Sequence, residues 1–183
     1  MATMLGSALA CAAFLAAAPA AASPRKSMPV SPASELGSRA RFEPPRGWTR
    51  EDSRVLGDPV ASFRSGSDVI RVQLLGGPKS RYRTVEEFLA GPEAQGTDGA
   101  AALVARRRAV AGRQVELRLR RLRAPAGGPG ADVTLEEFCL VAAGSRYFVL
   151  SHSVSSPDAP DLGARLPDWD AFLSSFRLSS ARK

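Results

Sequence analysis

Residues 133–154 have the sequence VTLEEFCLVAAGSRYFVLSHSV, in which two apolar, β-branched runs flank a short segment that contains Gly144. The runs 133–142 and 147–154 have the length and composition of strands, and Ala143-Gly144-Ser145 provides the turn between them. This stretch therefore predicts a β-hairpin. The same alternation predicts two further hairpins, one from strands 60–64 and 69–75 and one from strands 103–110 and 114–122.

Two helices are predicted beside these hairpins. Thr84-Val85-Glu86-Glu87 has the pattern of a capping box, in which the Thr84 hydroxyl accepts from the Glu87 N–H and the Glu87 carboxylate reaches back. A second helix is predicted near the C-terminus, capped by Asp168, from apolar residues at the spacing i, i+3, i+4 and i+7. Its apolar residues are Trp169, Phe172, Leu173 and Phe176. Burial of each such side chain contributes about 2 kcal/mol, so we expect this helix to pack on the sheet.

The chain is predicted to divide into three parts. Residues 1–22 form an apolar run without charged residues that ends in small residues, as expected of a signal peptide. Residues 23–38, rich in Pro and Ser, are predicted to be a disordered tether. Residues 39–180 suit a single α+β domain, in which a short strand at 41–43 and the three hairpins form an antiparallel sheet covered by helices. The protein is therefore expected to be exported, periplasmic or extracellular, and without a transmembrane segment once the leader is cleaved.

The charge balance is basic, with 25 Lys and Arg against 18 Asp and Glu and a net charge of +7. The candidate binding residues are Arg106, Arg108, Arg118 and Arg120. We expect them to line one solvent face of a hairpin, where guanidinium groups can bind carboxylate or phosphate bidentately. The competing interpretation is an ordinary solvated strand face. The expected partner is an envelope protein or an anionic envelope surface, and not nucleic acid, because an exported protein rarely meets it.

No residue type is present in the number or spacing that a catalytic, metal or cofactor site requires. His152 is the only histidine, and Ser151 and Ser153 face away from it on a strand, so it is expected to be a strand residue that is hydrogen-bonded or half exposed. Cys139 is expected to fill the core. Glu136 and Glu137 should face opposite sides of their strand. Asp158 and Asp161 are expected to shape turns.

Several segments, in chain order, resemble the PsbP/DcrB-like superfamily. They are FEPPRGW at 42–48, ASF at 61–63, VIRVQL at 69–74, TVEEFL at 84–89, RYFVL at 146–150 and AFLSSFR at 171–177. The resemblance spans residues 39–179 and implies an α/β/α sandwich, a non-enzymatic domain that occurs in exported bacterial proteins. Because members of this superfamily share architecture and no common site, no functional residue is carried over.

Together these observations predict an exported, non-enzymatic binding or accessory protein of the cell envelope. Two alternatives stay open at this point. One is an exported hydrolase without a His-based triad, and the other is a structural component of the envelope. A pocket with convergent polar groups would favour the hydrolase, whereas an apolar or basic surface patch would favour binding.

Overall fold

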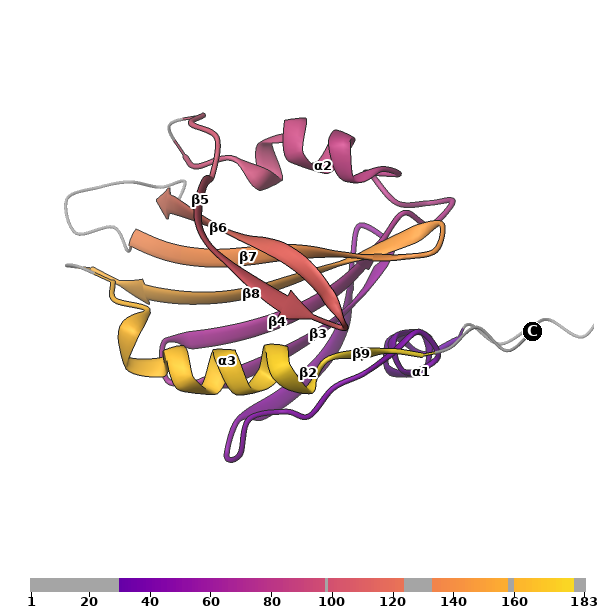
Figure 1. Cartoon of the computed structure of the whole chain (residues 1–183), viewed down its shortest axis with the longest axis horizontal. Coiled ribbons are helices and arrows are strands. Elements are labelled where there is room, and N and C mark those ends of the chain that lie inside the picture. Colours follow the sequence, from indigo (N-terminus) through magenta and orange to yellow (C-terminus); the bar gives the residue numbers. More distant parts are fainter. Residues whose placement is uncertain (1–29, 98, 124–132, 158–159, 180–183) are drawn as a thin grey trace, which may run out of the picture.

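The computed structural model describes residues 30–97, 99–123, 133–157 and 160–179 (Figure 1). The predicted leader and the first residues of the predicted tether lie outside these residues, as does Asp158. Within them the fold is α+β, with a seven-stranded antiparallel sheet in the order β2-β3-β4-β8-β7-β6-β5. The strands are β2 Thr49–Val55, β3 Asp58–Ser65, β4 Asp68–Leu75, β5 Leu103–Val110, β6 Arg113–Arg123, β7 Val133–Ala143 and β8 Arg146–Ser156.

The three predicted hairpins are present as β3–β4, β5–β6 and β7–β8. A two-stranded ladder also joins β1 Ala40–Arg41 to β9 Arg177–Leu178, so the predicted strand at 41–43 is found one residue earlier and shorter. The edge strand β2 was not predicted. Its sequence TREDSRV is exposed along most of its length, so it lacks the apolar alternation that identifies a half-buried strand.

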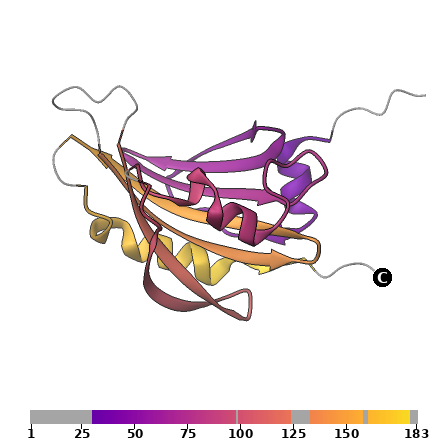
Figure 2. The same cartoon turned by 90° about the horizontal axis from the view of Figure 1, so that it is seen from above.

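Helices lie on both faces of the sheet. In Figure 1, α2 Val85–Ala90 lies above the sheet and α3 Leu166–Ser175 lies below it. The short 3₁₀ turns Pro92–Ala94 and Gly163–Arg165 adjoin these helices. Figure 2 shows the β5–β6 hairpin at the margin of the sheet farthest from β2. Among the described residues, no helix combines the length and the apolarity that a membrane span needs.

Each helix covers its own apolar cluster. The α2 side contains Phe88, Phe138 and Tyr147, and the capping box of Thr84 and Glu87 forms as predicted. The larger cluster lies under α3 and includes all four predicted side chains, which are buried. These are Trp169, Phe172, Leu173 and Phe176. The docking of the last helix on the sheet is therefore confirmed.

The start of α3 differs from the prediction. The helix begins at Leu166, and Asp168 lies inside its first turn, where it pairs with Arg165 at 3.4 Å instead of capping the helix. Pro167 is accommodated in the first turn because the N–H groups there have no intrahelical partner. The predicted N-cap therefore lies two residues inside the observed helix.

The predicted tether 23–38 is also too long. Residues Pro32–Gly37 form helix α1, which starts after Ser31, whose hydroxyl accepts from the Ser34 N–H at 3.2 Å. Leu36 is completely buried in the cluster under α3. Leu36 is the one buried apolar residue of this segment, so the sequence has no helical apolar periodicity there. Only the contact of Leu36 with the core identifies this helix as part of the domain.

Candidate functional site

The four candidate arginines lie on the β5–β6 hairpin, but they do not share a face. The register pairs Arg106 with Leu117, which is buried under α3, so Arg106 and Arg108 lie on the α3 face. Arg118 and Arg120 alternate with Leu117 along β6 and lie on the α2 face. The predicted single arginine face is therefore wrong. Alternation within each strand does not tell which residues of the two strands share a face, because this depends on the pairing register, which places Arg106 opposite Leu117 and Arg108 opposite Val115.

Arg106 and Arg108 connect β5 to the helix α3. The Arg106 guanidinium donates to both carboxylate oxygens of Glu137, at 2.9 and 2.7 Å, and its third nitrogen lies 2.9 Å from Asp170 Oδ1. Arg108 lies 2.8 Å from Asp170 Oδ2 and donates to Ser174 Oγ at 2.8 Å. The hydrogen bonds from Arg106 to Glu137 raise the pKa of Arg106. The two guanidinium groups of Arg106 and Arg108 thus pair with the two carboxylates of Glu137 and Asp170, and their positive and negative charges cancel.

Glu137 is the buried centre of that network. Besides the two bonds from Arg106, it accepts from Trp169 Nε1–H at 2.7 Å, so a carboxylate, a guanidinium and an indole join β7, β5 and α3. A buried carboxylate is tolerated only when its oxygens are paired in this way. The prediction that Glu136 and Glu137 face opposite sides is confirmed by their different partners.

Arg118 and Arg120 pair with glutamates on the α2 face. Arg118 donates to Glu116 Oε2 at 2.7 Å, and Arg120 forms an ion pair with the buried Glu136. The Arg120 guanidinium also lies over the ring of Phe138, 5.0 Å from its centroid. All four candidate arginines therefore have carboxylate partners within the domain. The guanidinium groups of Arg106 and Arg108 connect the hairpin to α3, and that of Arg120 connects it to β7.

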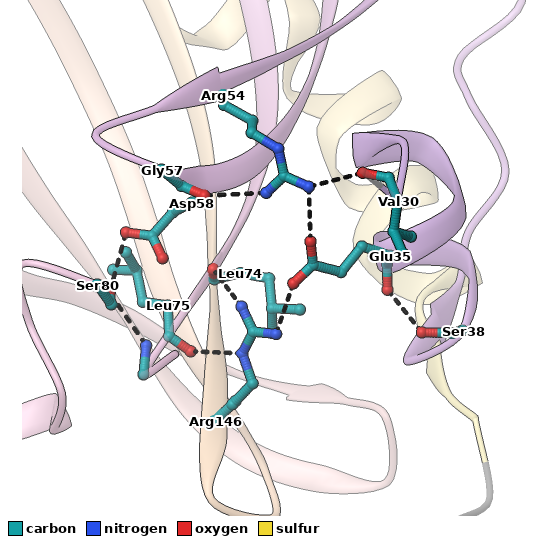
Figure 3. Close-up of polar contacts among 11 residues, drawn as sticks. Val30, Glu35, Ser38, Arg54, Gly57, Asp58, Leu74, Leu75, Ser80 and Arg146 are labelled. Carbon is teal, nitrogen blue, oxygen red and sulfur yellow. Dashed lines mark hydrogen bonds and ion pairs between the residues drawn. The ribbon is translucent and has the colours of Figure 1, made fainter. Parts of the chain in front are cut away.

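A second polar cluster joins α1 to the sheet, and sequence reasoning did not identify it (Figure 3). Glu35 on α1 accepts from Arg54 at 2.9 Å and from Arg146 at 2.7 Å, and these partners lie 19 and 111 residues away in the chain. Burial alone would raise the pKa of Glu35, but the bonds and charges of the two arginines outweigh it and hold the pKa below its ordinary value. No local pattern signals an ion triad assembled from three distant segments.

Asp58 and Ser80 lie beside this triad. Ser80 Oγ–H donates to Asp58 Oδ2 at 2.9 Å, and Ser80 Oγ accepts from the Gly76 N–H at 3.2 Å. Asp58 is buried, and this burial raises the pKa of its carboxyl despite the Ser80 bond and the charge of Arg146. Gly76 has φ +84°, and a Cβ there would lie 3.1 Å from Arg146 Cα, so the close approach of these segments requires glycine.

His152 and Cys139 occupy the core. His152 Nε2 lies 3.0 Å from Asp68 Oδ1, so of the two predicted environments the hydrogen-bonded one is present. The imidazole is fully buried near Trp169 and not half exposed. Burial raises the pKa of the Cys139 thiol to about 12, and its predicted place in the core is confirmed. Asp161 accepts from the Gly163 N–H at 2.8 Å, as expected of a turn residue. In the described ranges, no three His, Cys, Asp or Glu side chains gather as metal ligands would.

The outer edge of β5 is the most exposed part of the hairpin. Among the described residues β5 pairs only with β6, so the side of β5 away from β6 has no neighbouring strand. Leu103 is 75% and Val104 46% exposed, and the Arg107 side chain, 3.2 Å from Glu116, is 74% exposed. The opposite edge strand differs, because β2 is polar and Arg50 there pairs with Asp52 at 2.9 Å.

Comparison with known proteins gives structural likeness only. No family model matches the chain, and no curated protein matches it in sequence. A crystal structure from Bacteroides thetaiotaomicron VPI-5482 is similar with a TM-score of 0.47 and 9% identity, over 79% of this chain and 46% of that chain. LpqN of Mycobacterium tuberculosis, described as involved in cell envelope biogenesis, is similar with a TM-score of 0.37 and 10% identity, over 77% of this chain and 83% of LpqN. This chain thus spans less than half of the Bacteroides protein.

Proposed function

We propose that this chain is an exported accessory protein of the cell envelope, built as a PsbP/DcrB-like α/β/α sandwich, which acts by binding another envelope component. Export is supported by the uncharged apolar run of residues 1–22. The resemblance of residues 39–179 to the superfamily supports the sandwich and a role in binding. The candidate arginines are engaged inside the domain, so they are not the basis of the proposal.

The observation that carries the proposal is the exposed apolar pair Leu103 and Val104 on the open edge of β5. Exposed edge strands invite pairing with other chains. The β2 edge is polar from Thr49 to Arg54, whereas the β5 edge begins with the apolar pair and carries its charges only from Arg106 onward. Apolar side chains next to unpaired backbone groups offer both hydrophobic contact and main-chain hydrogen bonds to a partner. An envelope component that covers this edge would bury both.

Export is tested by expressing the full chain with a C-terminal tag in a bacterial host and fractionating the cells. Mass spectrometry of the product should give an N-terminus close to Ser23 in the periplasm or the medium. A product that stays in the cytosol with residues 1–22 attached would contradict export.

Binding is tested by sedimentation of the processed protein with isolated membranes and with cell-wall sacculi. Leu103→Lys with Val104→Thr should reduce co-sedimentation at least fivefold. The matched control is Val55→Thr with Leu56→Lys, which replaces a similar exposed apolar pair, 43% and 61% exposed, at the other edge of the sheet. Equal retention of both variants and of the wild type would contradict a role for the β5 edge.

A further inference from the structure

We infer that the open edge of β5 binds an extended acidic segment of a partner protein as an additional strand of the sheet. This inference rests on the proposed function and specifies the chemistry of the partner. It is drawn from the backbone geometry of the edge, from the side chains along it, and from the like charges that oppose self-pairing.

The backbone of the edge is accessible over the length of one strand. Leu103–Val110 has eight residues, the usual length of a strand, and its exposed positions continue from Leu103 through Ala105, Arg107 and Ala109. In an antiparallel pair, alternate residues direct their N–H and C=O groups away from the partner strand. Ala105 and Ala109 are too small to cover these groups, so an eighth strand can approach this edge of the seven-stranded sheet.

The side chains along the edge indicate what such a segment carries. Leu103 and Val104 form an apolar start, and the three consecutive residues Arg106, Arg107 and Arg108 follow without an acidic residue in the strand. Arg107 extends into solvent, and its ion pair with the part-exposed Glu116 is a surface pair of little energetic weight. A cross-strand carboxylate would pair with Arg107, while apolar residues would pack on Leu103 and Val104.

Arg107 disfavours a second copy of this chain as the occupant. Antiparallel pairing of two β5 strands about a twofold axis at Arg107 places Arg107 opposite Arg107 of the other copy, whereas Arg106 and Arg108 are already paired with Glu137 and Asp170 inside the domain. Like charges directly opposite each other destabilise a strand pair. Pairing of β5 with β2 of another copy is a head-to-tail contact, which leads to closed rings or open filaments and not to a simple dimer. Charge complementarity therefore favours a different, acidic chain.

The experiment uses the processed protein and three synthetic eight-residue peptides. The first alternates Val and Glu, the second alternates Val and Lys, and the third is the Val-Glu peptide with N-methylated amides at alternate positions. Binding is followed by ¹H–¹⁵N NMR titration to millimolar peptide and by hydrogen exchange of the β5 amides. We expect the Val-Glu peptide to bind at least tenfold more tightly than either other peptide and to slow exchange of alternate β5 amides at least tenfold.

A second set of measurements uses variants of the protein in which the charge of one arginine is reversed. Arg107→Glu should weaken binding of the Val-Glu peptide at least tenfold and improve binding of the Val-Lys peptide. Arg71→Glu, which reverses an exposed arginine on the central strand β4, should change neither more than twofold. Circular dichroism of both variants checks that the fold is retained.

The inference is overturned if the acidic and basic peptides bind alike, if N-methylation has no effect, or if the β5 amides gain no protection. A concentration-dependent dimer with protected β5 amides in the absence of peptide would overturn it in favour of self-pairing. If peptide binding fails while the Leu103 and Val104 variant still loses envelope binding, strand addition is wrong and the proposed function stands. Failure of export would instead refute the proposed function.

Discussion

Replacement of Arg106 by methionine tests whether buried charge pairing holds α3 on the sheet. The change removes the two hydrogen bonds that Glu137 accepts at 2.9 and 2.7 Å and leaves the Glu137 carboxylate with only the Trp169 indole as a donor. The Glu137 side chain is 6% exposed, so water does not replace the lost partner readily. Methionine has a similar reach and keeps the apolar contacts of the arginine stem.

The expected cost follows from this geometry. Removal of one member of a buried ion pair lowers the free energy of unfolding by about 3–5 kcal/mol. Because the Arg106 side chain is 28% exposed, some water can reach the vacated position, and we expect a loss near the lower limit, about 3 kcal/mol. With a urea dependence of about 2 kcal/mol per molar, the midpoint of unfolding should fall by about 1.5 M.

The assay is equilibrium urea unfolding at pH 7, followed by tryptophan fluorescence and circular dichroism. Two variants serve as controls. Arg106→Met with Glu137→Gln removes the buried charge while the Gln carbonyl still accepts from Trp169, so it should recover at least about 1 kcal/mol relative to Arg106→Met alone. Arg107→Met, at the neighbouring exposed arginine, should leave the midpoint almost unchanged. A midpoint for Arg106→Met close to wild type, or a double variant no more stable than the single one, would refute the reasoning.

Four further outcomes are expected. Phe172→Ala should lower the free energy of unfolding by about 3–5 kcal/mol, since this ring is buried between α3 and the sheet, and a loss below 1 kcal/mol in urea unfolding would contradict the packing. The folded protein lowers the pKa of Glu35, so the ionised carboxylate stabilises the fold above its unfolded pKa, and this stabilisation is lost as the pH falls. Glu35→Gln should therefore be less stable than the wild type at pH 7, and the difference should shrink in acid. The folded protein raises the pKa of Asp58, so the wild type loses stability as the pH rises and this carboxyl ionises. Asp58→Asn should therefore become more stable relative to the wild type between acid and neutral pH. Urea midpoints of variant and wild type that run parallel across pH would contradict the expected direction for Glu35 and for Asp58. The Cys139 thiol of the processed protein, with a pKa of about 12, should not react with Ellman's reagent at pH 8 until urea unfolds the domain, and rapid labelling of the native state would show that the site is open.

Local patterns predicted most of the elements, because their signals lie within a few residues of each other. The capping box at Thr84 and Glu87 formed as expected, and so did the turns of the three hairpins. The strand β2 and the helix α1 were missed because β2 is exposed and α1 buries a single leucine, so neither has a periodic apolar face.

The arrangement of the candidate site could not be predicted from local patterns. The sequence singled out Arg106 and Arg118 as candidates, but whether they share a face depends on the register between two strands, which pairs Arg106 with Leu117 and so places Arg118 on the opposite face. The partners of Arg106, Glu137 and Asp170, come from β7 and from α3, whereas Arg118 pairs with Glu116 on its own strand. Sequence distance conceals the pairs of Arg106, so part of an internal network was mistaken for a surface.

The amino-acid sequence by itself determined the hairpins, the buried face of the last helix and the basic character of β5, because strand alternation, helix periodicity and composition are local properties. Only the tertiary structure decided which charged side chains form ion pairs inside the domain and which edge of the sheet has no neighbouring strand. The physical reason is that ion pairing and strand order depend on distances between segments far apart in the chain. Arg106 is therefore part of the scaffold, while Arg107, one residue further, faces solvent on the edge that we propose to be the binding surface.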